Sequence, residues 1–526
     1  MDHPPTQPPA DIEPAPPTDV AATAPPPRCA VIRPHPWAAW AIIFGMIALL
    51  MSLPYLVGLD DEAAAEQREL ASQLANETIE SQGKIYLAFK YGFGVPAESL
   101  ASQLAALNEG EIGQRQRYAV IAYEFAGADA ARSVLDTIDN LSAVQPDQSA
   151  AADEHLEHNE ESLAVQSALR ALYGSGVSDS SGASADEPAP TPEAPAAPDL
   201  EALTETDRGA LIDHLGFLGE VAVNPPSLMP ADEREALFAA TVQLIIWGIV
   251  FFILFGLASL GGFVGLIVML VQALLGRLRG CVQDGGSYTG VYIETVALWV
   301  IVFFGSQMTL APLLAAGLPA SAQMLATFIV FMATLSVLLW PVLRGVRWQV
   351  IRRDIGWTLG SRPALEPAIG LAGYFMMVPL LVVGLVLTFL LFLLARLLFG
   401  DIAMPIHPIA GEAEGTFTQF VLLLLLACIA APIVEETMFR GLMYRHLRDS
   451  SRRMSPMASI LLSAFISAVI FAIIHPEGLL GTPAKASIGL ALAFMREWRG
   501  TLIPSMIMHG VNNAVVITLL WAMMNI

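Results

Sequence analysis

The sequence predicts an all-α, polytopic membrane protein with an extramembrane acidic helical insert. Hydrophobic residues make up 55% of the chain and the mean hydropathy is +0.57, which is too apolar for an ordinary soluble enzyme. Uncharged apolar windows of about 20 residues recur along the chain, and this length crosses a bilayer as a helix. Acidic residues outnumber basic ones by 49 to 27, and 33 of the 49 fall within residues 60–235.

The first elements are a tail and an apolar helix. Residues 1–35 are rich in proline and alanine, which is typical of a disordered segment. Residues 36–59 form the first apolar span, which is longer than the apolar core of a signal peptide and is therefore interpreted as an uncleaved anchor. The alanines at 63–65 leave cleavage as a minor alternative. Arginines before this span and acidic residues after it predict a cytoplasmic N-terminus in a bacterial plasma membrane.

Residues 60–235 are expected on the extracytoplasmic side as an acidic helical module. Between Glu66 and Leu141 apolar residues recur at three- and four-residue spacing, which indicates several helices. Residues 145–200 are expected to be a disordered linker, and residues 200–218 one more helix. The module is either a solvated spacer or a docking domain that recognises substrate. Its negative charge argues against nucleic acid as a partner.

The membrane domain is expected to begin at residue 236, with helices of unassigned role up to residue 350. Arginines concentrate on alternate loops, a pattern that fits nine spans in all. The apolar run at 236–276 is long enough for one span and a helical extension, and Gly261 and Gly262 are a candidate position for a break between them. The spans at 366–397 and 482–495 are too long and too short for upright helices, so tilt or re-entry is expected there. The eight spans expected after residue 235 are 236–260, 288–312, 320–343, 366–397, 416–434, 456–475, 482–495 and 501–524.

Three groups of polar residues lie in apolar surroundings near the end of the chain. Ionisable groups at membrane depth are costly and mark functional sites by default. The groups are Glu435, Glu436 and Arg440; Phe471 and His475; and His509 and Asn513. By contrast, three residues in expected loops or beside arginines are interpreted as surface residues: His407, His446 and Glu497.

Within the first group, helical spacing separates the two carboxylates. Glu436 and Arg440 are four residues apart, with the acid first, which favours an ion pair on one helix face. Glu435 is rotated by about 100° from Glu436, so both carboxylates cannot point the same way. This arrangement leaves Glu435 available for chemistry. Phe471 and His475 share a helix face, as do His509 and Asn513.

These side chains are of the types that activate water. Glu435 could take the proton from water with the help of His475. Alternatively, Glu435, His475 and His509 could hold a divalent metal such as zinc, which lowers the pKa of its bound water. His509 and Asn513 could stabilise an oxyanion. Each group also has a structural explanation, because ion pairs and interhelical hydrogen bonds hold membrane helices together.

One feature opposes a shared site. If each span begins at an interface, Glu435 and His475 would lie near opposite ends of neighbouring helices, about 20 Å apart. We therefore predict that Pro432 breaks the helix, so that Glu435 starts a second segment at a different depth.

The three groups resemble the motifs EExxxR, FxxxH and HxxxN of the CPBP intramembrane protease family, which includes the type II CAAX prenyl endopeptidases. The motifs are EETMFRG, FAIIH and HGVNN, in the family's order, and the resemblance covers roughly residues 351–518 of the domain expected at 351–526. It implies a glutamate-dependent proteolytic site in a helical bundle. The roles implied are water activation by Glu435 with His475, oxyanion binding by His509 and Asn513, and a flanking pair, Glu436 and Arg440.

The expected function is therefore that of an intramembrane endopeptidase that acts on membrane-associated peptides or proteins in contact with lipid. The alternative is a non-catalytic membrane scaffold or immunity-type protein that binds partners through the acidic module. A third possibility is a transporter that uses the polar groups as a proton relay. Against the transporter, the spans show no inverted repeat.

Overall fold

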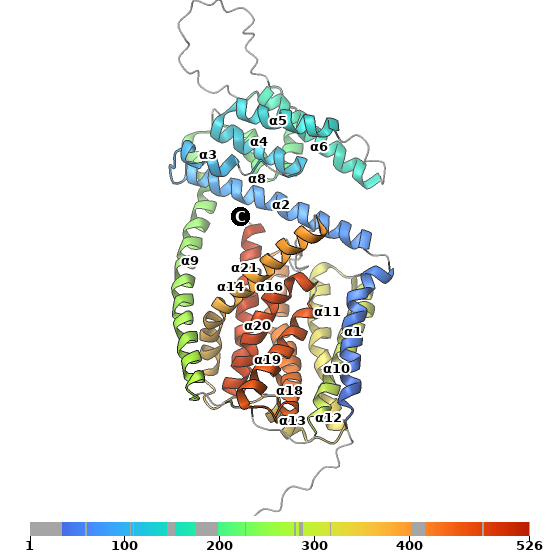
Figure 1. Ribbon diagram of the computed structural model, residues 1–526. Coiled ribbons are helices and arrows are strands. Elements are labelled where there is room, and N and C mark those ends of the chain that lie inside the picture. Colours follow the sequence, from blue (N-terminus) through green and yellow to red (C-terminus); the bar gives the residue numbers. More distant parts are fainter. Residues whose placement is uncertain are drawn as a thin grey trace, which may run out of the picture.

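All regular secondary structure in the residues described by the computed structural model is helical (Figure 1). The structure describes residues 34–524 except positions 58–59, 106, 109, 145–152, 175–197, 227, 278–279, 283–287, 316, 401–415 and 476–477. The all-α class is confirmed. The expected disordered tail at 1–35 lies outside the described residues, apart from its last two.

Within the described residues, eight helical segments are long and apolar enough to cross a membrane, so the chain is an integral membrane protein. A shorter apolar stretch, Pro36–Leu49, lies in the first helix. The eight segments are α9 (Ala231–Leu274), α10 (Gly290–Ala315), α11 (Ala320–Ala333) continued to Leu343 by η1 and α12, α14 (Glu366–Phe399), the run Phe417–Ser450, α19 (Pro456–Ile473), α20 (Gly478–Arg499) and α21 (Ile503–Met524). The short helix α13 (Trp348–Asp354) precedes α14.

The helices of the acidic segment gather at one end of this bundle, and α2 lies across that end (Figure 1). They share one hydrophobic core, separate from those of the bundle. The elements before the eight segments are α1 (Pro36–Val57), α2 (Asp60–Tyr91), α3 (Ala97–Ala105), α4 (Ile112–Ala126), α5 (Ala128–Val144), α6 (Asp153–Gly174), α7 (Glu205–Leu215) and α8 (Phe217–Val223). We call α2–α8 the module.

The start of α9 is built into the module. Phe238 is fully buried in the module core. Arg234 forms a buried ion pair with Glu124 of α4, with 2.7 Å between nitrogen and oxygen. The Tyr91 hydroxyl donates to the same carboxylate at 2.7 Å, and burial raises the pKa of Tyr91, so the hydroxyl stays a donor. These contacts fix the module to a membrane helix.

Two expectations for the acidic segment are corrected by the structure. Residues 153–174, within the expected linker, form α6, because Val165, Leu169 and Leu172 share a face that is buried in the module core. The rest of the expected linker up to residue 197 lies outside the described residues. The single helix expected at 200–218 is two short helices, which meet at Gly216 with a positive φ of 59°.

The membrane helices differ from expectation in length. The break expected at Gly261 and Gly262 is wrong, because α9 is one helix of 44 residues. Gly262 serves packing instead: a Cβ there would lie 2.2 Å from the carbonyl oxygen of Phe375 in α14. The span expected at 482–495 is the helix α20, which has 22 residues and is not too short. The expected span missed both ends of α20, because those turns contain polar residues. Figure 1 shows α14 running obliquely, as its length suggested.

The helix break predicted at Pro432 is also wrong. One helical run extends from Phe417 to Ser450 as α16 (Phe417–Leu425), η2 (Leu426–Ala430), α17 (Ala431–Glu436), η3 (Thr437–Met443) and α18 (Tyr444–Ser450). The segments η2 and η3 are π-helical. Because η2 widens the helix just before Pro432, the proline ring fits without breaking the run.

The length of this run resolves the problem of depth. Glu435 lies near the middle of the run, about 22 Å from its end at Ser450. His475 lies about 28 Å from the start of α19 at Pro456, just across the turn. The two residues are therefore at similar depths, although the helix is unbroken.

The close contact at Gly262 generates a stability prediction. Gly262→Val forces α9 and α14 apart, and overpacking of this kind costs about 1–3 kcal/mol. We expect a lower midpoint of thermal unfolding in detergent. Gly261→Val is the matched control, because a Cβ at Gly261 meets no atom within 4 Å. Equal midpoints for the two variants would contradict the packing role of Gly262.

Candidate active site

The two π-helical segments shape the centre of the bundle. A π-helical turn leaves backbone carbonyls without their usual helical partners, and such turns occur often at functional sites. The Asn513 amide donates to the Ala427 carbonyl in η2 at 2.7 Å. The Ser467 hydroxyl donates to the Phe439 carbonyl in η3 at 3.2 Å. Helices α21 and α19 are thereby fixed to the helix that carries Glu435.

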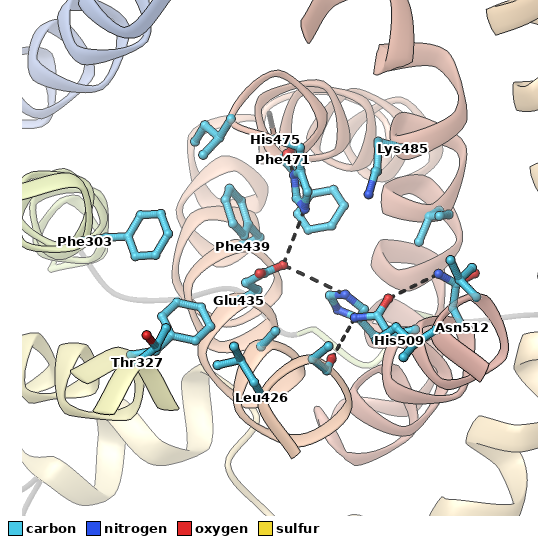
Figure 2. A pocket seen from close by; sticks show the side chains of 18 of the residues that line it. Phe303, Thr327, Leu426, Glu435, Phe439, Phe471, His475, Lys485, His509 and Asn512 are labelled. Atoms are coloured by element: carbon cyan, nitrogen blue, oxygen red, sulfur yellow. Dashed lines mark hydrogen bonds and ion pairs between the residues drawn. The ribbon is translucent and has the colours of Figure 1, made fainter. Parts of the chain in front are cut away.

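Glu435 lies between two imidazoles. Its Oε2 atom is 3.9 Å from Nε2 of His475 and 3.9 Å from Nε2 of His509 (Figure 2). Both separations are too long for hydrogen bonds. Oε2 is buried, and it has no hydrogen-bond partner among the described residues. A carboxylate oxygen and two ring nitrogens therefore face one another across a gap.

Beneath this gap lies a buried charge cluster. Glu436 and Arg440 are fully buried, and their side chains form an ion pair at 2.9 Å. Arg440 also donates to the Gly489 carbonyl at 3.2 Å, and its guanidinium carbon lies 4.3 Å from the Phe471 ring centre. Nδ1 of His509 lies 3.1 Å from the same Glu436 oxygen. Glu436 thus orients His509 as well as Arg440.

The position of His509 adds a link between the two carboxylates that their helical spacing did not suggest. Glu435 and Glu436 do point in different directions along the helix, but they reach opposite nitrogens of one imidazole. Their spacing on a helix could not reveal this arrangement, because the ring that joins them comes from α21.

The hydrogen bonds assign the ring hydrogens. Nδ1 of His475 lies 2.6 Å from the Phe471 carbonyl, which can only accept, so this nitrogen carries the hydrogen. In the neutral ring, Nε2 then presents a lone pair to the gap. Nδ1 of His509 likewise donates to the Glu436 carboxylate, which can only accept.

The asparagines lie beside His509. Asn513 is bound to Ala427 through its amide nitrogen, and its oxygen accepts from Asn512 at 3.3 Å. Asn512 also lines the cavity around Glu435, although the motif expectation did not include it. An amide nitrogen carries two hydrogens, so Asn513 can donate a second hydrogen bond.

A cavity of about 390 Å³ surrounds the gap, and its lining is mainly apolar and aromatic. Part of its wall comes from α10 and α11, including Phe303 and Thr327 (Figure 2). Lys485 of α20 lines it as well. None of these three residues was predicted from the sequence to belong to the site. The signal for Lys485 was a lone lysine within an apolar span, whereas nothing in the sequence linked α10 and α11 to the site.

Two residues interpreted as surface residues are buried outside the cavity. His446 lies 3.1 Å from the Thr289 carbonyl through Nδ1. Glu497 accepts hydrogen bonds from Tyr444 at 2.7 Å and from Arg448 at 3.0 Å. The surface interpretation was wrong because both residues join helices at the arginine-rich end. His407 lies outside the described residues.

The side chains at the gap include atoms that can bind metals. Two imidazoles and a carboxylate are chemically suitable ligands for zinc. However, the described part of the chain contains no group of three or more His, Cys, Asp or Glu side chains arranged to hold a metal ion. The side chains as placed do not fit a zinc ion.

The charge cluster generates a second prediction. Arg440→Met leaves Glu436 as a buried charge without its main partner, and breaking such a pair costs about 3–5 kcal/mol. We expect a clear fall in the free energy of unfolding, measured by denaturation in detergent. The double variant Glu436→Gln with Arg440→Met removes both charges and should recover part of the loss. A double variant that is less stable than Arg440→Met would contradict this account.

Comparison with known proteins bears on the same stretch of chain. A family model described as "Type II CAAX prenyl endopeptidase Rce1-like" matches residues 417–515, which is about a fifth of the chain. No curated protein and no solved structure gave a match. The matched segment begins with α16 and ends within α21, so it contains all the residues that meet at the gap. Residues 417–515 form an Rce1-like domain of the type II CAAX prenyl endopeptidase family.

Proposed function

We propose that the protein is an intramembrane endopeptidase that hydrolyses peptide bonds of membrane-associated substrates with water activated by Glu435. The family domain supports an intramembrane protease at the level of the family. The observation that carries the finer proposal is the gap at Glu435. The Glu435 oxygen is 3.9 Å from each of the two imidazole nitrogens, a separation that a water hydrogen-bonded to the carboxylate can bridge.

In the proposed reaction, Glu435 accepts a proton from this water as the water oxygen attacks the peptide carbonyl carbon. The lone pair on Nε2 of His475 holds the second water hydrogen and so orients the attack. The carbonyl oxygen becomes an oxyanion. His509, in its protonated form, and the second hydrogen of the Asn513 amide donate to that oxygen.

The tetrahedral intermediate then collapses. The carbon–nitrogen bond breaks, and Glu435 returns the proton to the leaving amine nitrogen. The products are a carboxylic acid and an amine, and Glu435 is again a carboxylate. Glu436 and Arg440 do not touch the substrate in this scheme. They hold His509 in place and stabilise its charge.

The cavity suits an apolar peptide segment. Its volume of about 390 Å³ is within the range of ligand sites, and mainly apolar linings with a few polar groups are typical of them. A row of aromatic rings leads from the gap to the wall of the cavity. The ring centres of Phe471 and Phe439 are 5.3 Å apart, and those of Phe439 and Trp299 are 5.7 Å apart. We infer that α10 and α11 provide the wall against which the substrate packs.

A passive scaffold is not favoured. If Glu435 only held helices together, its buried oxygen should form a hydrogen bond, because an unsatisfied buried acceptor costs about 1–3 kcal/mol. Instead, this oxygen lies beyond hydrogen-bond distance from both imidazoles. The same arrangement suits a group that works on a bound water. The proposed topology places the module on the extracytoplasmic side, because arginines concentrate at the other end of the bundle.

The first functional prediction concerns Glu435. Glu435→Gln preserves size and removes the base, so we expect cleavage of membrane-associated peptides to fall by about a hundredfold or more. The assay is release of a quenched fluorophore in proteoliposomes. The exposed Glu235→Gln serves as the control and should cleave at the normal rate. A folded Glu435→Gln protein with full activity would exclude the proposed function.

The second functional prediction concerns the cavity wall. Thr327→Trp fills part of the cavity that Glu435 also lines and should displace the substrate, and a displacement of about 1 Å can lower the rate about a hundredfold. Thr309→Trp adds the same ring to an exposed position on α10 and should leave kcat/KM unchanged. Equal activity of the two variants would show that substrates do not use this wall.

A further inference from the structure

Gln307 is a polar residue within the apolar helix α10, and its side chain is exposed. The polar side chains on either side of it bind to their own helix. The Ser306 hydroxyl donates to the Phe303 carbonyl at 2.7 Å. The Thr309 hydroxyl donates to the Gly305 carbonyl at 2.7 Å. The Gln307 amide forms no hydrogen bond with any residue that the structure describes. An amide without a partner is costly at membrane depth, so Gln307 is a candidate for binding a ligand.

This amide belongs to the face of α10 that lines the cavity around Glu435. Trp299, Phe303 and Gln307 are each four residues apart, a spacing that places them on one helix face. All three line the cavity. Figure 2 shows the Phe303 ring pointing from α10 toward Glu435. Gln307 therefore continues an aromatic wall with a polar group.

The other polar groups of this wall are already used within the protein. The Trp299 indole donates to the Thr334 hydroxyl at 3.2 Å. The Thr327 hydroxyl donates to the Gln323 carbonyl at 2.9 Å. Among the described residues of α10 and α11 that line the cavity, Gln307 is thus the one whose side chain keeps both its donors and its acceptor for a ligand.

Two contacts show how α10 runs relative to the helical run that carries Glu435. The Thr289 carbonyl, just before α10, lies 3.1 Å from Nδ1 of His446. Further along α10, the Trp299 ring centre lies 5.7 Å from that of Phe439. The residue numbers rise on α10 while they fall on the run, so the two helices are antiparallel. Both are traced from the arginine-rich end toward the module.

This alignment gives the level of Gln307. Gln307 lies eight residues beyond Trp299, or about 12 Å along α10. Glu435 lies four residues beyond Phe439 in the same direction, or about 6 Å. Gln307 is therefore about 6 Å nearer to the module than Glu435. An extended peptide advances about 3.3 Å per residue, so this separation corresponds to about two residues of a bound chain.

A peptide in this cavity needs partners for its main chain. The carbonyl groups of a helical peptide are engaged in its own hydrogen bonds, so the segment to be cleaved has to unwind. Each unwound N–H and C=O group then requires a partner, because lipid offers none. A glutamine side chain carries an amide with the same donor and acceptor chemistry as a peptide group.

We propose that Gln307 binds the main chain of the substrate about two residues from the scissile bond. Its amide oxygen accepts from a peptide N–H, and its amide nitrogen donates to a peptide carbonyl. This inference rests on the proposed function, because the ligand is the peptide to be cleaved. Such binding does not depend on the side chains of the peptide, so Gln307 positions substrates of different sequence in one register.

The test measures binding of a labelled apolar peptide to the full-length Glu435→Gln protein in detergent, by fluorescence anisotropy. In a series of the same peptide, an ester replaces one amide at a time, which removes one N–H with little change in shape. We expect one ester to bind about two- to tenfold more weakly than the parent peptide, because it lacks the hydrogen bond to Gln307. Equal binding of the parent and every ester would overturn the inference.

Substitutions then assign this loss to Gln307. In the same Glu435→Gln protein, Gln307→Leu should weaken the parent peptide by a similar factor, and the critical ester should bind no more weakly than the parent. Gln349→Leu makes the same change at an exposed position on α13 and should leave the full ester effect in place. If the ester effect is as large with Gln307→Leu as without it, the N–H binds elsewhere and the inference fails.

Cleavage by the protein with Glu435 intact separates this inference from the proposed function. Cleavage of the parent peptide together with an ester effect that ignores Gln307 would overturn the role of Gln307 alone. An ester effect that depends on Gln307, without cleavage of any peptide, would overturn the proposed function and leave Gln307 as a peptide-binding residue.

Discussion

The buried carboxylate of Glu436 is the interaction on which the centre of the bundle depends. It holds Arg440 on its own helix and His509 on α21, so one charge fixes two helices and the direction of one imidazole. Arg440 in turn donates to Gly489 of α20. A buried charge tolerates few alternative packings, because each of them leaves a partner unsatisfied. The position of Glu435 next to this cluster therefore follows from a network with little freedom.

Much of the fold was predictable from the sequence. Long apolar windows identify membrane helices because lipid leaves the backbone no other partners. Helix lengths were less predictable. Gly261 and Gly262 look like a break, but a glycine also permits close helix contact, and only the tertiary structure shows that Gly262 faces α14. Residues 153–174 are polar enough to suggest disorder, yet their few apolar residues align on one buried face.

The residues of the candidate site could be named from the sequence, but the contacts between them on different helices could not. Three short motifs identified Glu435, His475 and His509, because charged and polar groups stand out against an apolar background. The link between Glu436 and His509 spans helices far apart in sequence, so no local spacing can reveal it. The same is true of the π-helical segments, which depend on partners such as Asn513 and Ser467 in other helices.

The origin of the cavity wall has a wider consequence. Phe303 and Thr327 come from helices before residue 417, outside the stretch that matches the family. The segment 417–515 alone would have one side of its reaction chamber open to lipid. If this segment were transferred to another protein, it would carry Glu435, His475 and His509 but would lack the part of the cavity wall that α10 and α11 provide. Under the proposed function, the groups that act on water would come from residues 417–515, and part of the surface that receives the substrate would come from α10 and α11.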